Sequence, residues 1–183
     1  MTTEFEMLLE GMRRAGAALR DAGVPFALAG SLATWARGGT ETDHDVDFVL
    51  KPRDAERALD ALAAAGFRCE RPPENWLYKA YDEFETLIDL IFAPNNVPVD
   101  DALLDRADVF EVYAVELPVL AAGDVLATML LALGEHRLDY DRPLGVARSL
   151  REQIDWEYVR GRTCDSPYAR AFVVLAEELG IAA

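Results

Sequence analysis

The sequence predicts an α/β (α+β) fold, in which a small mixed sheet is flanked by helices and followed by a C-terminal helical region. Between residues 24 and 117, short apolar runs bounded by Gly or Pro alternate with helical stripes, as in layered α/β proteins. From residue 118 to residue 183, apolar residues recur mainly at helical spacing. We expect one domain over 1–183, with 24–117 as its core, because 183 residues suffice for a sizeable core.

The N-terminal third of the chain alternates between helical and strand patterns. Gly23 and Gly66 follow helical stripes at the position where glycine commonly ends a helix. Pro52 stands at the start of another stripe, where a first-turn N–H needs no partner within the helix. The expected elements, in order, are a helix over 4–22, a strand over 26–29, a helix over 32–37, a strand over 45–50 and a helix over 53–65.

The remainder begins with strands and continues into helices. Pro72-Pro73 separates two strand candidates, and Pro118 is expected to stop an edge strand, because proline cannot donate to a ladder. The expected elements are strands near 67–71, 75–81 and 86–92, a short helix near 99–106, an edge strand over 110–117, a helix over 123–134, and two or three helices at about 143–153, 155–161 and 166–179.

Composition narrows the classes of function. Hydrophobic residues make up 51% and charged residues 28%, as in ordinary globular proteins, and no run approaches the roughly 18 apolar residues of a membrane span. The acidic N-terminal segment is unlike a signal peptide, and Cys69 and Cys164 lack metal-type spacing, so we expect a cytoplasmic chain with two free thiols. The net charge of −15 argues against broad nucleic-acid binding and suits a cationic small molecule or a basic protein.

Two acids precede an apolar run. Asp45 and Asp47 lie two residues apart in an expected strand, so both project from one face of it. Two such carboxylates repel and lose hydration unless a cation lies between them. A divalent metal such as Mg²⁺ would serve, since it prefers oxygen ligands. A solvated strand end is the simpler interpretation of this pair taken alone.

Two further features lie in the same part of the chain. Gly30-Ser31 follows a strand and precedes a helix, where glycine lets the backbone approach a ligand and serine can cap a helix whose free N–H groups bind phosphate. Asp89 lies in the middle of the apolar run 86–92. A charge is costly to bury there, so we expect Asp89 to have a function or a buried partner.

In order and spacing, Gly30-Ser31, Asp45-x-Asp47 and a lone acid on a later strand resemble the signature of the DNA polymerase β-type nucleotidyltransferase superfamily. Its small bacterial members include antibiotic, minimal and toxin–antitoxin nucleotidyltransferases. The resemblance covers roughly residues 24–137 and implies a nucleotidyltransferase-like sheet. It also implies transfer of a nucleoside monophosphate from an NTP to a hydroxyl acceptor, with pyrophosphate as the leaving group.

The resemblance assigns roles to particular residues. Asp45, Asp47 and Asp89 would be catalytic and would bind Mg²⁺ or Mn²⁺. Gly30 and Ser31 would bind the β- and γ-phosphates of the NTP.

The remaining assignments concern cations. Arg37 and Lys79 are further candidates for binding the nucleotide, although a solvated loop arginine and a surface lysine are the simpler interpretations. Related sequences often carry a lysine where Met129 stands here, and methionine suits core packing. His136 and Arg137 could replace that cation, or could simply form a polar helix end.

The acceptor is not readable from the sequence. A cationic small molecule, a tRNA or a protein would each be consistent with it, and an antitoxin or a second copy of the chain could be a partner; no membrane is expected. The alternative is a non-catalytic nucleotide-binding or toxin–antitoxin interaction module with the same fold, which the methionine at position 129 favours.

Overall fold

The computed structural model describes residues 3–40 and 45–182, and it confirms the predicted α/β class. Its strands form a mixed sheet in the order β3-β4-β5-β2-β1-β7-β6. The strands are β1 (Phe26–Leu28), β2 (Val46–Leu50), β3 (Arg68–Glu70), β4 (Leu77–Tyr81), β5 (Leu87–Ile91), β6 (Asp108–Val112) and β7 (Val115–Val119). The helices are α1 (Glu4–Asp21), α2 (Gly30–Ala36), α3 (Ala55–Ala64), α4 (Asp101–Asp105), α5 (Ala122–Leu131), α6 (Asp141–Ser149), α7 (Trp156–Arg162) and α8 (Pro167–Glu178), with short 3₁₀ turns at Pro52–Asp54, Pro94–Asn96 and Arg151–Gln153.

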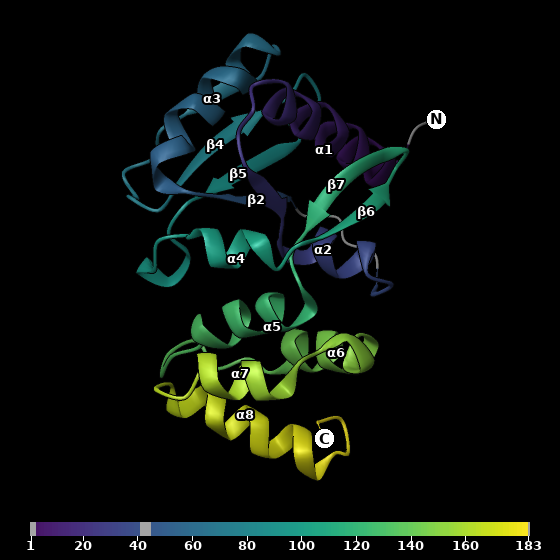
Figure 1. Cartoon of the computed structure of the whole chain (residues 1–183), viewed down its shortest axis with the longest axis vertical. Coiled ribbons are helices and arrows are strands. Elements are labelled where there is room, and N and C mark those ends of the chain that lie inside the picture. The colour runs from purple at the N-terminus through teal and green to yellow at the C-terminus, as the bar shows by residue number, and fades with distance from the viewer. Residues whose placement is uncertain (1–2, 41–44, 183) are drawn as a thin grey trace.

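The helices lie in layers around the sheet. Helices α1 and α3 pack against each other and against the central strands (Figure 1). Figure 1 shows α5 between the sheet region above and α6, α7 and α8 below. The buried apolar residues form two clusters, one around the sheet and one within the C-terminal helices, and Met129 of α5 packs against both. Helix α5 therefore joins the sheet region to the helical region.

The order of the central strands brings distant segments together. Strand β2 runs antiparallel to β1 and parallel to β5, and Asp47 is the register partner of Asp89. Strand β4 runs antiparallel to β5 and places Lys79 opposite Asp89. Three polar side chains from three strands consequently lie in one row across the sheet.

The prediction of a single edge strand over 110–117 is wrong. This segment contains a hairpin in which β6 pairs with β7, and β7 also pairs with β1, so β7 lies inside the sheet. The turn has positive φ at Tyr113 (49°) and Ala114 (62°), a conformation usually signalled by Gly or Asn. Pro118 is tolerated within β7 because the pairing with β1 is confined to the end of the strand, at Val119.

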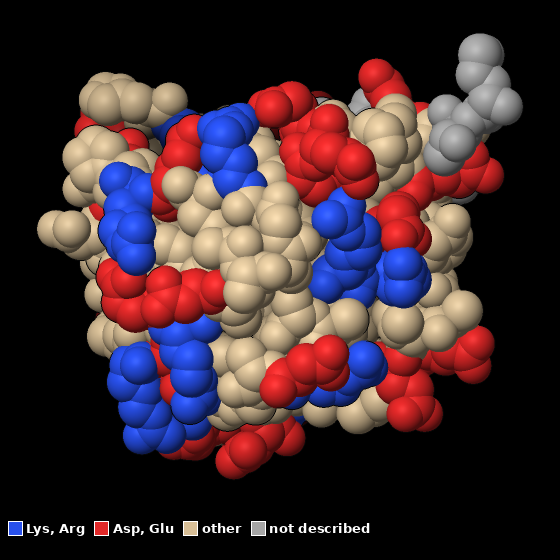
Figure 2. Space-filling model, turned by 90° about the horizontal axis from the view of Figure 1, so that it is seen from above, with Lys and Arg blue, Asp and Glu red and all other residues tan. Residues whose placement is uncertain are grey.

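Charge is evenly mixed on the face shown in Figure 2, where acidic and basic side chains are interspersed. Several of the basic side chains form ion pairs, including Arg13 with Glu10 and Arg71 with Glu56. Cys69 and Cys164 are both free, as expected. Within the described ranges, no helix combines the length and apolarity that crossing a membrane requires.

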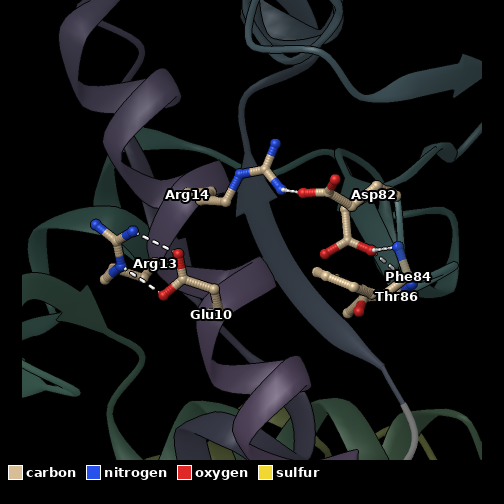
Figure 3. Close-up of polar contacts among 7 residues, drawn as sticks. Glu10, Arg13, Arg14, Asp82, Phe84 and Thr86 are labelled. Carbon is tan, nitrogen blue, oxygen red and sulfur yellow. Dashed lines mark hydrogen bonds and ion pairs between the residues drawn. The ribbon is translucent and has the colours of Figure 1, made fainter. Parts of the chain in front are cut away.

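The turn between β4 and β5 is organised by a buried carboxylate. Asp82 is 4% exposed, and its Oδ1 accepts the backbone N–H groups of Phe84 and Thr86, each at 2.9 Å (Figure 3). Its Oδ2 is buried with no hydrogen-bond partner in the described part of the chain. Only one of the two oxygens therefore stabilises the turn.

We expect Asp82→Ala to lower the free energy of unfolding by about 1–3 kcal/mol, because two backbone N–H groups would lose their acceptor. Asp82→Asn keeps one carbonyl oxygen for those N–H groups and removes the charge from the unpaired position, so it should stay within about 1 kcal/mol of the wild type. Denaturant unfolding of both variants measures the difference. Equal losses of unfolding free energy in the two variants would show that Oδ2 also contributes to the stability of the turn.

Candidate active site

The carboxylates of Asp45, Asp47 and Asp89 converge. One ligand atom from each lies within 4.8 Å of the others. Asp45 directly precedes β2, Asp47 lies within it, and the pairing of β2 with β5 aligns Asp89 beside them. The three acids therefore lie close enough to share a metal, and their convergence depends on the adjacency of two strands that are about 40 residues apart in the chain.

The convergence has an electrostatic cost. Burial, followed by repulsion from Asp45 and Asp89, raises the pKa of Asp47 to about 7, although part of the Asp47 side chain is exposed. Burial also raises the pKa of Asp89, and the hydrogen bond from Lys79 opposes that rise. A cluster of carboxylates in which the pKa values of Asp47 and Asp89 are raised is a site suited to a divalent cation.

Gly30 is required by the approach of Asp47. It has φ of +60°, a region that L-residues with side chains rarely adopt. A Cβ at this position would lie 2.9 Å from the carboxyl carbon of Asp47 and would overlap its Oδ2. The first residue of α2 thus lies directly against the acid cluster.

Ser31 lies beside this contact but does not cap α2, which corrects one expectation. Ala29 occupies the N-cap position and makes no side-chain cap bond, while Ser31 lies within the first turn. The Ser31 Oγ is buried and has no hydrogen-bond partner among the described residues. A buried hydroxyl without a partner lowers the stability of the fold, and a ligand that formed a hydrogen bond to this oxygen would offset that cost.

Lys79, which the sequence suggests as a candidate for binding the nucleotide, forms an ion pair with an acid. Its Nζ lies 2.9 Å from Oδ1 and 3.2 Å from Oδ2 of Asp89, which is only 7% exposed. Lys79 neutralises the third carboxylate of the cluster. Lys79 is therefore not an isolated surface lysine, and its contact with a phosphate stays a prediction.

We expect Lys79→Met to destabilise the metal-free protein by about 1–3 kcal/mol at neutral pH, because Asp89 would lose both bonds to its buried carboxylate. Mg²⁺ should then raise the melting temperature by more than it does in the wild type. Lys51→Met is the matched control, since Lys51 pairs with the exposed carboxylate of Asp101, outside the cluster. Identical responses of the two variants to Mg²⁺ would contradict a role for Lys79 at the acids.

Arg37 is placed elsewhere. Its Nε donates to the Leu120 carbonyl at 2.6 Å, and its Nη2 donates to the Val119 carbonyl at 3.1 Å and to Asp108 at 2.7 Å. The side chain is 5% exposed. Arg37 therefore joins the end of α2 to the β6–β7 hairpin, and it is neither a solvated loop residue nor free to bind phosphate.

A cleft of about 300 Å³ lies between the acids and the C-terminal helices. Gly30, Ser31 and the acids Asp45 and Asp47 line one part of it, and Met129, Ala132, Leu133, Arg137, Asp139, Arg142 and Pro143 line the rest. Met129 is therefore at the site as well as partly in the core. Arg142 was missed from the sequence, because nothing local distinguishes it from other exposed helix residues.

The predicted helix over 123–134 ends earlier than expected. Helix α5 ends at Leu131, and a tight turn over residues 134–137 follows, with backbone bonds between Gly134 and Arg137. Arg137 faces the cleft from this turn, and His136 is exposed in the same turn. Neither residue is part of a polar helix end.

The donor set fits a hard divalent cation. Three carboxylates supply oxygen ligands within 4.8 Å of one another, and burial and repulsion from Asp45 and Asp89, which a cation would offset, raise the pKa of Asp47. Mg²⁺ or Mn²⁺ would bind to such oxygens, whereas the described residues of the cluster include no nitrogen or sulfur ligand typical of a zinc site.

The fold is shared with solved structures. A crystal structure of ANT(2")-Ia in complex with adenylyl-2"-tobramycin is 13% identical, with a TM-score of 0.63 over 90% of this chain and 95% of that chain. The chain has the nucleotidyltransferase fold. The lincosamide antibiotic adenylyltransferase LnuA, bound to lincomycin, shares this fold at 11% identity, with a TM-score of 0.50 over 79% of this chain and 91% of that one.

A third nucleotidyltransferase-fold structure is an antigenic nucleotidyltransferase-like protein from Paracoccidioides brasiliensis. It is 12% identical, with a TM-score of 0.52 over 96% of this chain and 88% of that chain. No protein-family model matches the sequence, and no curated protein matches it. The likeness therefore lies in the fold.

Proposed function

We propose that this chain is a metal-dependent nucleotidyltransferase, which moves a nucleoside monophosphate from an NTP to a hydroxyl acceptor. The observation that carries the proposal is the convergence of Asp45, Asp47 and Asp89, of which Asp45 and Asp47 line one cleft together with Gly30 and Ser31. The nucleotidyltransferase fold is consistent with the proposal. A fold alone does not specify a function, so the proposal depends on the groups that this site supplies.

The residues would act mainly through position and charge. Asp45 and Asp47 would hold the metal, which would neutralise phosphate charge when bound. The acceptor oxygen would attack the α-phosphorus, the bond from that phosphorus to the pyrophosphate oxygen would break, and Asp89 would accept the hydroxyl proton. Ser31 Oγ and the backbone at Gly30 would contact the departing phosphates.

For the acceptor, we propose a cationic small molecule that carries a hydroxyl group. The net charge of −15 supports this class over tRNA, because a polyanion would be repelled. Two structures of this fold contain adenylyl-2"-tobramycin and lincomycin, and both tobramycin and lincomycin are small molecules with hydroxyl groups. The protein would work in the cytoplasm, where NTPs and Mg²⁺ are present.

The test is transfer of label from α-³²P-labelled NTPs, with Mg²⁺ or Mn²⁺, to a panel of aminoglycosides, a lincosamide, bulk tRNA and a basic protein. Metal-dependent labelling of a small molecule, absent in Asp47→Asn, is the expected result. Labelling of tRNA or protein alone would overturn the acceptor class. Metal-dependent NTP binding without any transfer would favour the non-catalytic module, and absence of NTP binding would overturn the whole proposal.

A further inference from the structure

A second cavity, of about 380 Å³, lies on a different face of α5 from the acid cleft. Asp124, Ala127, Thr128 and Leu131 line it at the three- and four-residue spacing of one helix face, whereas Met129 lines the acid cleft. Figure 1 shows α5 between α4 and α7, and both of those helices contribute side chains to the cavity. No described residue lines both the cavity and the acid cleft, so a ligand in one need not contact the other.

One wall of this cavity is an ionic cluster that the fold holds in place. Asp124 is 3% exposed, and its carboxylate accepts the Nε of Arg106 at 3.0 Å and the Nη2 at 2.8 Å. The hydroxyl of Tyr158 accepts a further bond from Arg106 at 2.7 Å and donates one to Asp124. The Nη1 of Arg106 makes no hydrogen bond or ion pair with a described residue. Asp124 is therefore neutralised within the cluster, while one end of the guanidinium can still donate to a ligand.

Arg162 of α7 brings a second guanidinium to the same wall. It is exposed, lines the cavity, and has neither a hydrogen bond nor an ion pair among the described residues. Burial and the bond to Asp124 raise the pKa of Tyr158 to about 12, and the charges of Arg106 and Arg162 oppose that rise. Both guanidiniums therefore lie near one hydroxyl group, on the same side of the cavity.

The acids of the cavity, in contrast, already accept hydrogen bonds. Asp124 and Asp100 are the acids among the described residues that line it, and the Oδ1 of Asp100 accepts the backbone N–H of Leu103 at the start of α4. The charged groups that still lack partners are thus N–H donors of two arginines. Such donors match the oxygens of a carboxylate or a phosphate.

The rest of the wall is largely apolar. Its apolar side chains include Pro94, Val97, Pro98, Leu103 and Leu131. The loop after β5, which carries the two prolines, is attached to α5 by a hydrogen bond from Asn95 to the Thr128 carbonyl at 3.1 Å. A cavity of this size, with an apolar wall and a few polar groups at one side, is typical of a site for a small organic molecule.

We propose that this cavity binds a small organic oxyanion, a carboxylate or a phosphate monoester carried on a compact apolar group. The oxyanion accepts N–H groups of Arg162 and Arg106, and the apolar group lies against the prolines and leucines of the opposite wall. Asp124 and Tyr158 hold the Arg106 guanidinium in position before the ligand arrives. This second site lies outside the acid cleft and does not depend on the proposed function.

The probes are phenyl phosphate and benzoate, with benzamide and benzylamine as their neutral and cationic counterparts. Isothermal titration of the full chain in chelator should show binding of both anions, and benzamide and benzylamine should bind at least about tenfold more weakly. The ratio of the two anion affinities distinguishes a phosphate monoester site from a carboxylate site. Equal affinities for phenyl phosphate and benzamide would overturn the proposal.

Two single variants of equal charge change test the role of Arg162. Arg162→Met removes the guanidinium without a partner, and Arg148→Met is the matched control, because Arg148 also lacks a partner among the described residues but does not line the cavity. The affinity for phenyl phosphate should fall at least about tenfold in Arg162→Met and less than about threefold in Arg148→Met. Equal losses would leave only a general charge effect and would overturn the assignment.

A bulky substitution tests where the anion binds. Ala102 is exposed on α4 and lines the cavity, so the indole of Ala102→Trp can fill the cavity without entering the core. This variant should no longer bind either anion, whereas Ala64→Trp, at an exposed position of α3 outside the cavity, should bind both as the wild type does. Undiminished binding in Ala102→Trp would place the anion elsewhere and overturn the proposal.

Competition separates this site from the acid cleft. Saturating Mg²⁺ and a non-hydrolysable ATP analogue should leave the affinity for phenyl phosphate within about threefold of its value without them. Competitive displacement would place the anion in the acid cleft and would overturn the proposal. A chain that bound phenyl phosphate through Arg162 but transferred no nucleotide would contradict the proposed function and support this second site.

Discussion

Asp47→Asn is expected to abolish nucleotidyl transfer and, at the same time, to stabilise the metal-free protein. Burial, and then repulsion from its acidic neighbours, raises the pKa of Asp47 from its ordinary 3.8 to about 7. A tenfold change in an acid dissociation constant corresponds to about 1.4 kcal/mol. Since water reaches part of the side chain, we expect a gain of about 1–3 kcal/mol in the free energy of unfolding at pH 8 or above.

The same shift predicts the pH dependence of the metal-free protein. The folded-state pKa of Asp47 lies above its unfolded-state value, so the folded state binds more protons between about pH 4 and pH 7. Stability should therefore fall as the pH rises through this window, and Asp47→Asn should lack that contribution. Thermal melts in chelator across the window measure it, and a wild-type stability that rises with pH at the same rate as the variant's would contradict the pKa.

Metal should reverse this trend. Bound Mg²⁺ favours ionised carboxylates, so its effect on the wild-type melting temperature should be small near pH 5 and large near pH 8. Asp47→Asn should lose most of that effect. Asp139→Asn is the matched control, because Asp139 lines the same cleft outside the acid cluster, and it should respond to Mg²⁺ as the wild type does.

Gly30→Ala is the second substitution with a large expected effect. Its Cβ would overlap the Asp47 carboxylate, so either the helix start or Asp47 must move. If the helix start moves, we expect the free energy of unfolding to fall by about 3 kcal/mol or more. If Asp47 moves, Mg²⁺ should no longer raise the melting temperature. Denaturant unfolding and melts with Mg²⁺ measure the two outcomes.

Gly23→Ala separates the clash from the backbone conformation. Gly23 has φ of +65°, almost equal to that of Gly30, but a Cβ there would meet nothing within 4 Å. The free energy of unfolding of Gly23→Ala should fall only by the roughly 1–2 kcal/mol that a left-handed conformation costs an L-residue. Mg²⁺ should still raise the melting temperature of this variant. Similar results for the two variants would show that the close approach of Asp47 to Gly30 affects neither stability nor metal binding.

Local patterns predicted most of the elements because each is set by neighbours in the chain. The apolar stripe of α1 and the glycine after it specified that helix closely, and two-residue spacing placed Asp45 and Asp47 on one face. The β6–β7 hairpin was missed because Tyr113 and Ala114 adopt positive φ without the usual Gly or Asn. Their conformation is stabilised by the pairing of β6 with β7, and β7 is in turn held by β1, which is far away in the chain.

The sequence by itself determined that Gly30-Ser31, an acid pair and a buried lone acid exist in the right order. Only the tertiary structure decided that Asp89 lies beside Asp45 and Asp47 and that Lys79 neutralises Asp89. It also decided that Arg37 bonds to the Leu120 carbonyl and that Arg142 faces the cleft. The physical reason is that periodicity sets which face a side chain occupies. Its charged partner, in contrast, depends on which strands and helices become neighbours, and that is decided by packing among segments far apart in the chain.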